Sequence, residues 1–409
     1  MSERWHVCLA GWQKVAWALD EDLRWVRRAL DDQCCWSSLP LARIVHAAWP
    51  AAVHAIPSGA LRGKNVVCQA DNPPAFYLGD DVFAAAAPRV SLWIARSGEA
   101  LSQFRCLGLP ASRVPYCVDP GVFRPLPDRA AIRRSLGLAE NAFVIGNFHR
   151  DSEGADLARP KRQKGPDLFL QIARGLRARV PGAVVLLAGP RRHWLLGALR
   201  AAEIPVVFAG RELGDSDDFQ DNVLPRERLN ELYQALDVCV VSSRWEGGPY
   251  SVLEALAAGT PVISTPVGTA RDVLPQTCLF RSVGQAADLL VEHAECGSLS
   301  APCAEAAAVA ARSHSSAAVR DALLQAYMVM PVGRAPITEA ALSAWGLASG
   351  HVVARAAQRD AGLEAMAKAV REKALSFKGE VDFINYPDDG TNDDLIGCAA
   401  RIAAARGAK

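Results

Sequence analysis

The strongest constraint on this chain is an alternation of short apolar runs with longer amphipathic segments, which occurs twice along the sequence. The first series has apolar runs at residues 5–10, 43–47, 65–68 and 90–95. The second series has them at residues 142–146, 184–189, 205–209, 237–241 and 261–264. Unbroken apolar strands with helices between them are typical of a parallel sheet that is covered on both faces. We therefore predict an α/β protein with two facing Rossmann-like domains, and a ligand cleft between the carboxyl ends of their sheets.

Prolines mark the passage from the first series to the second, with five of them between residues 110 and 127. Such a stretch suits a linker or a domain edge better than the interior of an element. We place a first domain at residues 1–135 and a second domain at 136–312. A helix at 313–330 is expected to return to the first domain. Residues 331–409 are alanine-rich, and we expect a mainly helical C-terminal extension of unassigned role.

Composition excludes several classes of protein. The formal net charge of the 409 residues is +1, which gives no global field for nucleic acid. The eleven cysteines are odd in number and scattered, which favours reduced thiols and a cytoplasmic protein over a disulfide framework. No run approaches the roughly 20 apolar residues of a membrane span. Peripheral contact with the inner face of a membrane stays compatible with these features.

The segment from Arg244 to Gly268 carries the most chemical information. An apolar strand ends near residue 241, a double-glycine loop follows, and a helix begins at about residue 249. Glycines ahead of a helix let backbone amides approach a ligand, and a helix start favours anions. We expect this loop and helix start to contact the ligand through Gly247, Gly248, Pro249 and Tyr250.

Two carboxylates in this segment need partners. Glu254 lies in an otherwise apolar helix, where a buried carboxylate is costly unless it has donors such as the two hydroxyls of a ribose. The competing interpretation is a helix cap, since Ser251 and Glu254 have capping-box spacing. Proline at position 249 would put Glu254 beyond the turn where capping works, and the residues alone leave both interpretations open. Glu246, in the preceding loop, could accept hydrogen bonds from a sugar.

The order of these residues resembles a known family. Glu246, seven residues, Glu254 and then Ala-Leu-Ala-Ala-Gly-Thr-Pro-Val-Ile is similar to the signature of retaining glycosyltransferases of the GT-B fold, family four, or group 1. The resemblance extends outward to residues 229–243, to the proline-rich segment 114–125, to Gly146-Asn-Phe-His-Arg150 and to Lys164-Gly165. It covers residues 90–275 well, the first 90 residues loosely and the tail not at all.

The resemblance implies a role for each matching residue. Glu254 would hold the ribose hydroxyls, and Glu246 would contact hydroxyls of the donor sugar. Arg150 and Lys164 would bind the diphosphate, whose charge grows as the glycosidic bond breaks. Arg211 is included among the nucleotide-binding candidates.

Two departures from the family pattern concern charged or polar groups. Ten residues, 151–160, stand between the expected arginine and lysine, so Arg159, Lys161 or Arg162 could replace either cation. In the first domain, the family's His-Asp pair is reduced to Asp71, and Gly11 stands alone where two glycines are usual.

Asp71 follows an apolar strand and precedes Asn-Pro-Pro, so it is either a polar group facing the reacting sugar or the start of a turn. His46 and His54 are rivals for the same role, although a histidine that follows an apolar run is more typical of a core residue.

These features predict transfer of a sugar from a nucleotide diphosphate sugar to a hydroxyl of a glycan, glycolipid or small molecule, with retention of configuration. The resemblance implies that arginine and lysine neutralise the diphosphate, so no metal or other cofactor is expected. Two alternatives stay open. One is a catalytically silent GT-B subunit that regulates a partner, and the other is a sugar-nucleotide epimerase or phosphorylase on the same fold.

Overall fold

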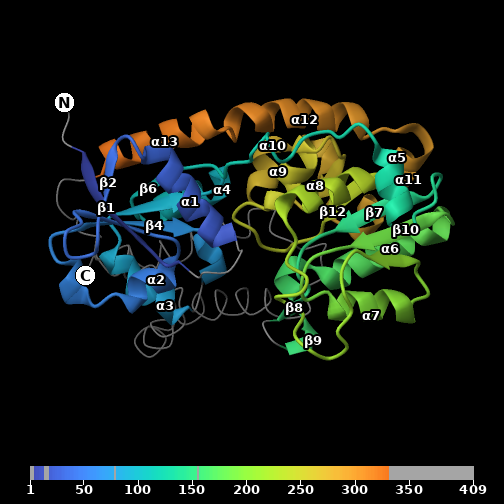
Figure 1. Cartoon of the computed structure of the whole chain (residues 1–409), viewed down its shortest axis with the longest axis horizontal. Coiled ribbons are helices and arrows are strands. Elements are labelled where there is room, and N and C mark those ends of the chain that lie inside the picture. The colour runs from blue at the N-terminus through green and yellow to red at the C-terminus, as the bar shows by residue number, and fades with distance from the viewer. Residues whose placement is uncertain (1–3, 13–17, 78–79, 154–155, 331–409) are drawn as a thin grey trace, which may run out of the picture. The chain divides into compact units, whose positions relative to one another are not determined.

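The computed structural model describes residues 4–12, 18–77, 80–153 and 156–330, so the predicted C-terminal extension lies outside the described residues. The chain divides into two compact units (Figure 1). The first unit comprises the described residues up to 117 together with residues 316–330, and the second comprises those from 118 to 315. Both units carry the predicted parallel α/β architecture.

The first unit is built on a six-stranded parallel sheet with the order β2-β1-β3-β4-β5-β6. Its strands are β1 (Trp5–Ala10), β2 (Cys34–Trp36), β3 (Ile44–Ala47), β4 (Asn65–Ala70), β5 (Leu92–Ala95) and β6 (Ala111–Arg113). The strand order reverses between β1 and β3, which are neighbours in register from Val7 opposite Ile44. Their apolar side chains are buried because helices cover both faces of such a sheet.

The helices of the first unit include one from the far end of the described chain. They are α1 (Ala18–Leu30), α2 (Pro50–Ala55), α3 (Asp81–Ala86), α4 (Gly98–Cys106) and α13 (Ser316–Met328), with short 3₁₀ turns η1 (Ser58–Leu61), η2 (Pro74–Tyr77) and η3 (Ala87–Arg89). Helix α13 packs against α1 and β6 (Figure 1). Its Val319 and Leu323 enter the same core as Val7 and Leu30. Burial of these side chains fixes the helix on the first sheet.

The second unit is built on a five-stranded parallel sheet with the order β11-β10-β7-β12-β13. Its strands are β7 (Phe143–Asn147), β10 (Ala183–Leu187), β11 (Val206–Phe208), β12 (Val238–Val241) and β13 (Val262–Ser264). The chain starts at β7, moves outward through β10 to β11, and then crosses back to β12 and β13. This reversal is the doubly wound pattern, and it leaves a switch point between β7 and β12.

Helices surround the second sheet. They are α5 (Arg129–Ser135), α6 (Pro166–Arg179), α7 (His193–Ala201), α8 (Arg226–Ala235), α9 (Tyr250–Ala257), α10 (Thr269–Val273), α11 (Val283–Cys296) and α12 (Ser300–Ser313), with 3₁₀ turns η4 (Arg162–Lys164) and η5 (Gln276–Cys278). Across the described residues of both units, every helix is too short or too polar to cross a membrane.

The division between the units falls between residues 117 and 118, not after residue 135 as the proline pattern predicted. Helix α5 therefore belongs to the second unit. The reason is ionic: Arg133 is buried, its Nη2 lies 2.6 Å from an Asp237 carboxylate oxygen, and its Nε donates to the Ala235 carbonyl at 2.9 Å. A proline-rich segment signals a linker, but the side chains beyond it decide which sheet they join.

Three short strand features were not predicted from the sequence. Strands β2 and β6 are the outer strands of the first sheet and have three residues each. The antiparallel pair β8 (Ser152–Glu153) and β9 (Asp156–Pro160) forms a small hairpin between β7 and α6. Edge strands and hairpins of this length bury little apolar surface, so their sequences carry no strand periodicity.

Candidate functional site

The switch point of the second sheet gathers most of the predicted site residues. Strand β7 ends at Asn147 and leads into the turn that holds His149 and Arg150. Strand β12 ends at Val241 and leads into the loop of residues 242–249, which is buried throughout. Strands β7 and β12 are parallel neighbours, so both segments leave the same edge of the sheet at adjacent positions. Ligands of open parallel sheets bind at such an edge.

The central feature of this edge is an ion pair between two residues that the sequence proposed for the site. The Lys164 Nζ lies 2.5 Å from the Glu246 Oε1, and the Ser243 hydroxyl donates to the same oxygen at 2.8 Å. The Glu246 side chain is 8 % exposed and that of Lys164 is 21 % exposed. Burial is the largest single influence and disfavours the charged carboxylate, but the Lys164 charge and the hydrogen bonds from Lys164 and Ser243 together outweigh it and lower the pKa of Glu246. The Glu246 carboxylate is therefore charged at neutral pH.

Glycines allow the loops of this edge to approach one another. Gly165 has φ +60°, and an added Cβ would lie 1.8 Å from the Ser242 carbonyl oxygen. Gly268 has φ +46°, and an added Cβ would lie 2.5 Å from the carbonyl oxygens of Glu246 and Gly247. Any side chain at these two positions would push the loops apart. The glycine of the Lys-Gly pair is thus explained by packing against the loop that carries Glu246.

A second ion pair fixes the loop that carries Lys164. The Arg244 guanidinium contacts both carboxylate oxygens of Asp167 at 2.8 Å, and it donates to the Arg162 carbonyl at 2.9 Å. The backbone amide of Arg244 donates to the Gln163 carbonyl at 2.8 Å. A bidentate pair of this kind fixes orientation as well as distance. Arg244 therefore positions the turn η4, and Lys164 at its end, against the loop after β12. The sequence analysis did not assign this role.

His149 is a site residue that the sequence analysis missed. Its Nε2 lies 2.6 Å from the Ser251 hydroxyl oxygen at the start of α9. Burial, together with the nearby Lys164 charge, lowers the pKa of His149 to about 3, so the ring is neutral at pH 7. The signal available in the sequence was its place directly before Arg150, at the end of an apolar strand.

The structure separates the two interpretations of Glu254. Helix α9 has Pro249 as its N-cap residue with no side-chain cap, and Ser251 is engaged with His149. The helix-cap interpretation is therefore wrong. The buried Glu254 carboxylate instead accepts a hydrogen bond from the Tyr233 hydroxyl, 3.1 Å from its Oε2. Burial raises the pKa of Glu254, because a charged carboxylate is disfavoured away from water. The helix begins at Tyr250, one residue later than predicted, so Pro249 is its N-cap residue and not its first helical residue.

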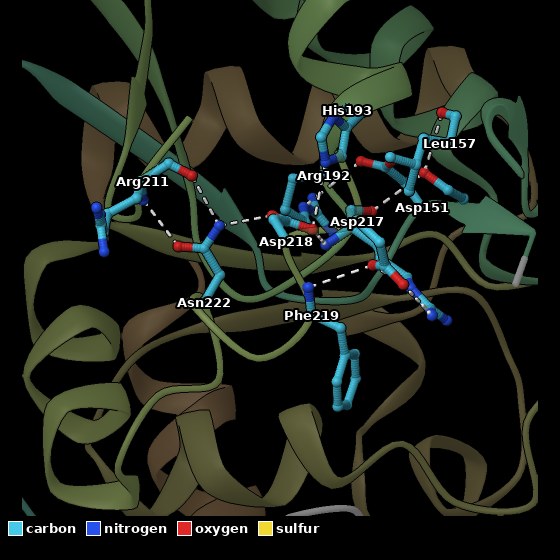
Figure 2. A network of polar contacts seen from close by, with 11 residues as sticks. Asp151, Leu157, Arg192, His193, Arg211, Asp217, Asp218, Phe219 and Asn222 are labelled. Atoms are coloured by element: carbon cyan, nitrogen blue, oxygen red, sulfur yellow. Dashed lines mark hydrogen bonds and ion pairs between the residues drawn. The ribbon is translucent and has the colours of Figure 1, made fainter. Parts of the chain in front are cut away.

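The residues inserted between Arg150 and Lys164 form a hairpin with its base held closed. The Lys161 amide donates to the Asp151 carbonyl at 2.6 Å, so the chain returns to where it left. The Arg192 Nε lies 3.5 Å from the Asp151 carboxylate (Figure 2). Arg192 Nη2 also donates to the Asn147 carbonyl at 2.9 Å. Burial raises the pKa of Asp151 to about 6, although the Arg192 charge opposes the shift. The inserted residues therefore lengthen the loop, while the turn η4 that carries Lys164 is retained.

The remaining cations are distributed differently. Arg150 is half-buried in the turn between β7 and β8, and Arg159 is exposed on β9. The backbone of Arg211 is held by Asn222, with N···Oδ1 at 2.7 Å. Figure 2 shows the Arg211 guanidinium turned away from Arg192, and the side chain is 74 % exposed. Of the candidate cations, Lys164 is the one whose described contacts reach a second candidate site residue, Glu246. In the described parts of the chain, no three His, Cys, Asp or Glu side chains are grouped to hold a metal ion.

In the first unit, Asp71 directly follows β4 and is held by two side chains. The Tyr116 hydroxyl donates to its Oδ1 at 3.1 Å, and the Arg96 Nε lies 3.8 Å from the same oxygen. Arg96 is buried and also pairs with the buried Asp22 at 3.1 Å. The Asp71 side chain is 26 % exposed, so one end of this cluster reaches the surface. Asp71 is therefore a fixed carboxylate at the carboxyl edge of the first sheet.

A buried chain of hydrogen bonds continues from Arg96 into the core. Arg96 donates to the Gln69 amide oxygen, which leaves the Gln69 amide nitrogen to face His46 Nε2 at 2.9 Å. The His46 Nδ1 lies 2.8 Å from the Tyr327 hydroxyl. Because the Gln69 nitrogen can only donate, His46 accepts at Nε2 and carries its proton on Nδ1. The interpretation of His46 as a satisfied core histidine is confirmed, and His54 is exposed on α2.

Gly11 is explained by packing. It follows β1 with φ +97°, and an added Cβ would lie 2.8 Å from the Ala52 Cβ and 3.2 Å from the Ala48 Cβ. The close approach of α2 to the end of β1 thus requires a glycine, whether or not a ligand also contacts its backbone.

Comparison with known proteins gives this geometry a context. Residues 155–308 match the family described as glycosyl transferases group 1. The chain is 31 % identical over 218 residues to a D-inositol 3-phosphate glycosyltransferase of Catenulispora acidiphila, covering 50 % of this chain and 48 % of that protein. It is 30 % identical over 180 residues to the lipopolysaccharide core biosynthesis mannosyltransferase LpsB of Rhizobium meliloti, covering 44 % and 46 %. The chain thus spans about half the length of the curated relatives it matches.

A solved structure has a similar fold. The Anabaena protein HepE, in complex with UDP and glucose, superimposes with a TM-score of 0.63 at 15 % identity, covering 80 % of this chain and 100 % of that one. At this identity the likeness concerns the fold alone. The prediction of the GT-B fold is confirmed.

Proposed function

We propose that this chain, whose residues 155–308 match the group 1 glycosyl transferases, transfers a sugar from a nucleotide diphosphate sugar to a hydroxyl acceptor with retention of configuration. The observation that carries the proposal is the Lys164–Glu246 pair, 2.5 Å long, at the switch point of the second sheet. It supplies a fixed cation beside a fixed acceptor, which suit a diphosphate and a sugar hydroxyl respectively.

Both members of the pair retain bonding capacity for a donor. The described contacts of the Glu246 carboxylate fall on Oε1, so Oε2 can accept from a hydroxyl of the donor sugar. An ammonium has three donors, and Glu246 uses one of those of Lys164. Lys164, with Arg150 as its partner, would then donate to the diphosphate and stabilise the charge that develops as this group leaves. Glu246 also keeps Lys164 in position before the donor arrives.

Glu254 is proposed as the ribose ligand. The Tyr233 hydroxyl contacts its Oε2, and Oε1 can accept from the ribose diol. The raised pKa of this buried carboxylate supports the idea, because two hydroxyl donors would compensate the cost of its charge. Gly247, Gly248, Pro249 and Tyr250 would bring the backbone before α9 to the donor, and Gly11 and Arg211 stay secondary candidates.

For the reaction, we propose same-face attack. The acceptor oxygen bonds to the anomeric carbon as the bond from that carbon to the diphosphate breaks, and the acceptor proton passes to the leaving diphosphate oxygen. Asp71 is proposed to hold an acceptor or sugar hydroxyl, since Arg96 and Tyr116 keep its carboxylate oriented. Arg150 and Lys164 supply the positive charge in this scheme, and we propose that no resident metal is needed.

The experiment is a two-step assay of the full chain. Thermal shifts with UDP, GDP, ADP and their sugars identify the donor; UDP-glucose belongs in the screen because the Anabaena structure holds UDP and glucose. Inositol 3-phosphate is a first acceptor, given the names of the relatives. Slow release of nucleotide without acceptor, and an α-configured product from an α-configured donor by NMR, are expected. Tight binding without turnover in any combination would instead favour the silent-subunit alternative, and an inverted product would exclude retention.

A further inference from the structure

The first unit contains a cavity at the edge of its sheet opposite to Asp71. The cavity has a volume of about 1220 Å³ and is lined by Trp5, Ile44 and Asn65, the first residues of β1, β3 and β4. Asp71 follows the last residue of β4, at the carboxyl edge. Because the strands are parallel, the cavity and Asp71 lie at opposite edges of the same sheet, and the cavity is not part of the proposed sugar-transfer site.

Basic side chains line this cavity from the segments that enter the sheet. They are Arg43, Arg62, Lys64 and Arg89. Among the described residues that line it, none is acidic. The Lys64 ammonium donates to the carbonyl oxygens of Ala42, at 2.6 Å, and Pro40, at 3.2 Å. Carbonyl partners orient the ammonium without neutralising it, so the cavity has a positive potential.

The loop between η1 and β4 leaves room for a ligand next to these charges. Gly59 and Gly63 line the cavity, and an added Cβ at either would meet nothing within 4 Å. Arg62 lies between them in the sequence and is exposed. Trp5 and Met328 add an aromatic ring and a thioether to the lining, and the Met328 side chain is largely exposed. The lining thus combines cationic side chains with an apolar part.

We propose that this cavity binds a phosphate-bearing anion, with Arg62 and Lys64 as its main contacts. Phosphate is the common anion that takes several charge-assisted hydrogen bonds from arginine and lysine at once. Two sources share this chemistry: a soluble phosphate or diphosphate ester, and the head group of an anionic phospholipid whose chain contacts the apolar part. The proposal is independent of sugar transfer, because it uses other residues at the other edge of the sheet.

Calorimetric titration of the full chain with inorganic pyrophosphate tests the soluble source, and flotation with phosphatidylcholine vesicles, with and without phosphatidylglycerol, tests the head group. Titrations are done with the wild type and with Lys164→Ala, because binding in this cavity does not depend on Lys164 and should be the same in both. Arg62→Gln and Lys64→Gln should each weaken binding roughly tenfold, the scale of one charge-assisted hydrogen bond. Raising the salt from about 50 to 500 mM should weaken it further, because exposed charges are screened.

The matched control is Arg174→Gln, which removes an exposed arginine from α6 in the second unit and should leave binding unchanged. Pyrophosphate binding that depends on Arg62 supports a soluble ligand, and vesicle binding that depends on Arg62 and on phosphatidylglycerol supports a head group. Binding to neither probe, or binding that Arg62→Gln and Arg174→Gln reduce equally, would overturn the proposal.

Discussion

The polar clusters of the two units are built in opposite ways. In the second unit, Lys164 and Glu246 lie on two loops that glycines and a bidentate Arg244–Asp167 pair hold together. In the first unit, the polar chain passes only through side chains, from Asp71 through Arg96 to the core. The first arrangement depends on backbone shape, and the second on the matching of donors and acceptors.

This difference predicts different responses to substitution. A loop-based site can lose one charge and keep its backbone, since other contacts hold the loops in place. A side-chain chain is cooperative, because every member satisfies the next and a buried polar group without a partner is costly. Substitutions in the second unit should therefore act mainly on function, whereas replacing a buried member of the first unit's chain, such as Arg96, should also lower stability.

The largest effect is expected for Lys164→Ala. Removing a cation aimed at the leaving diphosphate should lower turnover about 100- to 1,000-fold, the scale for loss of one stabilising group in a transition state. Donor affinity should change less, because the charge on the leaving group peaks late in the reaction. Steady-state kinetics together with donor titration measure both quantities.

The control for this prediction is Arg159→Ala, which removes an exposed cation from the inserted hairpin. It should keep normal turnover. If Arg159→Ala is the damaging change and Lys164→Ala is mild, the assignment of the diphosphate cation moves to the hairpin, where Lys161 and Arg162 are the next candidates. Equal losses of turnover and donor affinity in Lys164→Ala would show that Lys164 binds the donor equally in the ground state and in the transition state, and does not specifically stabilise the leaving group.

The second effect concerns Asp71. Asp71→Asn should lower turnover on the order of a hundredfold if the carboxylate acts on a reacting hydroxyl. The melting temperature should change little, because Arg96 keeps its pair with Asp22 at 3.1 Å. Arg96→Met, in contrast, leaves Asp22 buried without its cation and should cost about 3–5 kcal/mol of stability. Near-normal transfer by Asp71→Asn would leave Asp71 with a structural role only, at the start of a turn. Unchanged stability of Arg96→Met would contradict the proposed difference between the two units.

These contrasts also explain what the sequence could predict. The strand pattern and the Glu246–Glu254 segment could be recognised because a parallel sheet needs apolar runs and closely packed loops need glycines at fixed places. The chain from Asp71 to Tyr327 was not readable, since Arg96, Gln69 and Tyr327 come from separate elements and meet only in the fold. Arg96 in particular appeared as an ordinary charged residue after a strand.

The third effect, which is smaller, concerns Glu254. Glu254→Gln should weaken nucleotide binding by roughly 1–3 kcal/mol, the scale for a hydrogen bond to a charged group. The fold should be retained, because glutamine can still accept from Tyr233. Tyr233→Phe is the informative companion: it removes the donor to Oε2 and should affect nucleotide binding less than the glutamate variant. Calorimetric titration with the identified nucleotide compares them, and unchanged affinity in Glu254→Gln would exclude a ribose contact.

The smallest effect is a pH dependence of stability that belongs to the first unit. Burial lowers the pKa of His46 to about 3, whereas an unfolded histidine titrates near 6.5. The unfolded state therefore binds a proton that the folded state refuses between these values, and the free energy of unfolding falls as the pH drops below about 6.5. At pH 5.5 this linkage amounts to about 1.4 kcal/mol, and it vanishes above pH 7.5. His149 has a similarly lowered pKa and adds a parallel contribution in the wild-type protein.

Replacing His46 isolates its share. His46→Gln is expected to lower stability at every pH, because it breaks the contacts with Gln69 and Tyr327, but its stability should fall less steeply between pH 7.5 and 5.5 than that of the wild type. Denaturant unfolding at pH 7.5 and 5.5 gives the loss of stability between the two pH values for each protein. The pH-independent destabilisation of His46→Gln cancels in this difference. Parallel curves for the two proteins would mean that His46 takes up a proton while folded. In that case the hydrogen-bond chain would accommodate a charge. The first unit would then depend less on the matching of donors and acceptors than its contrast with the second unit implies.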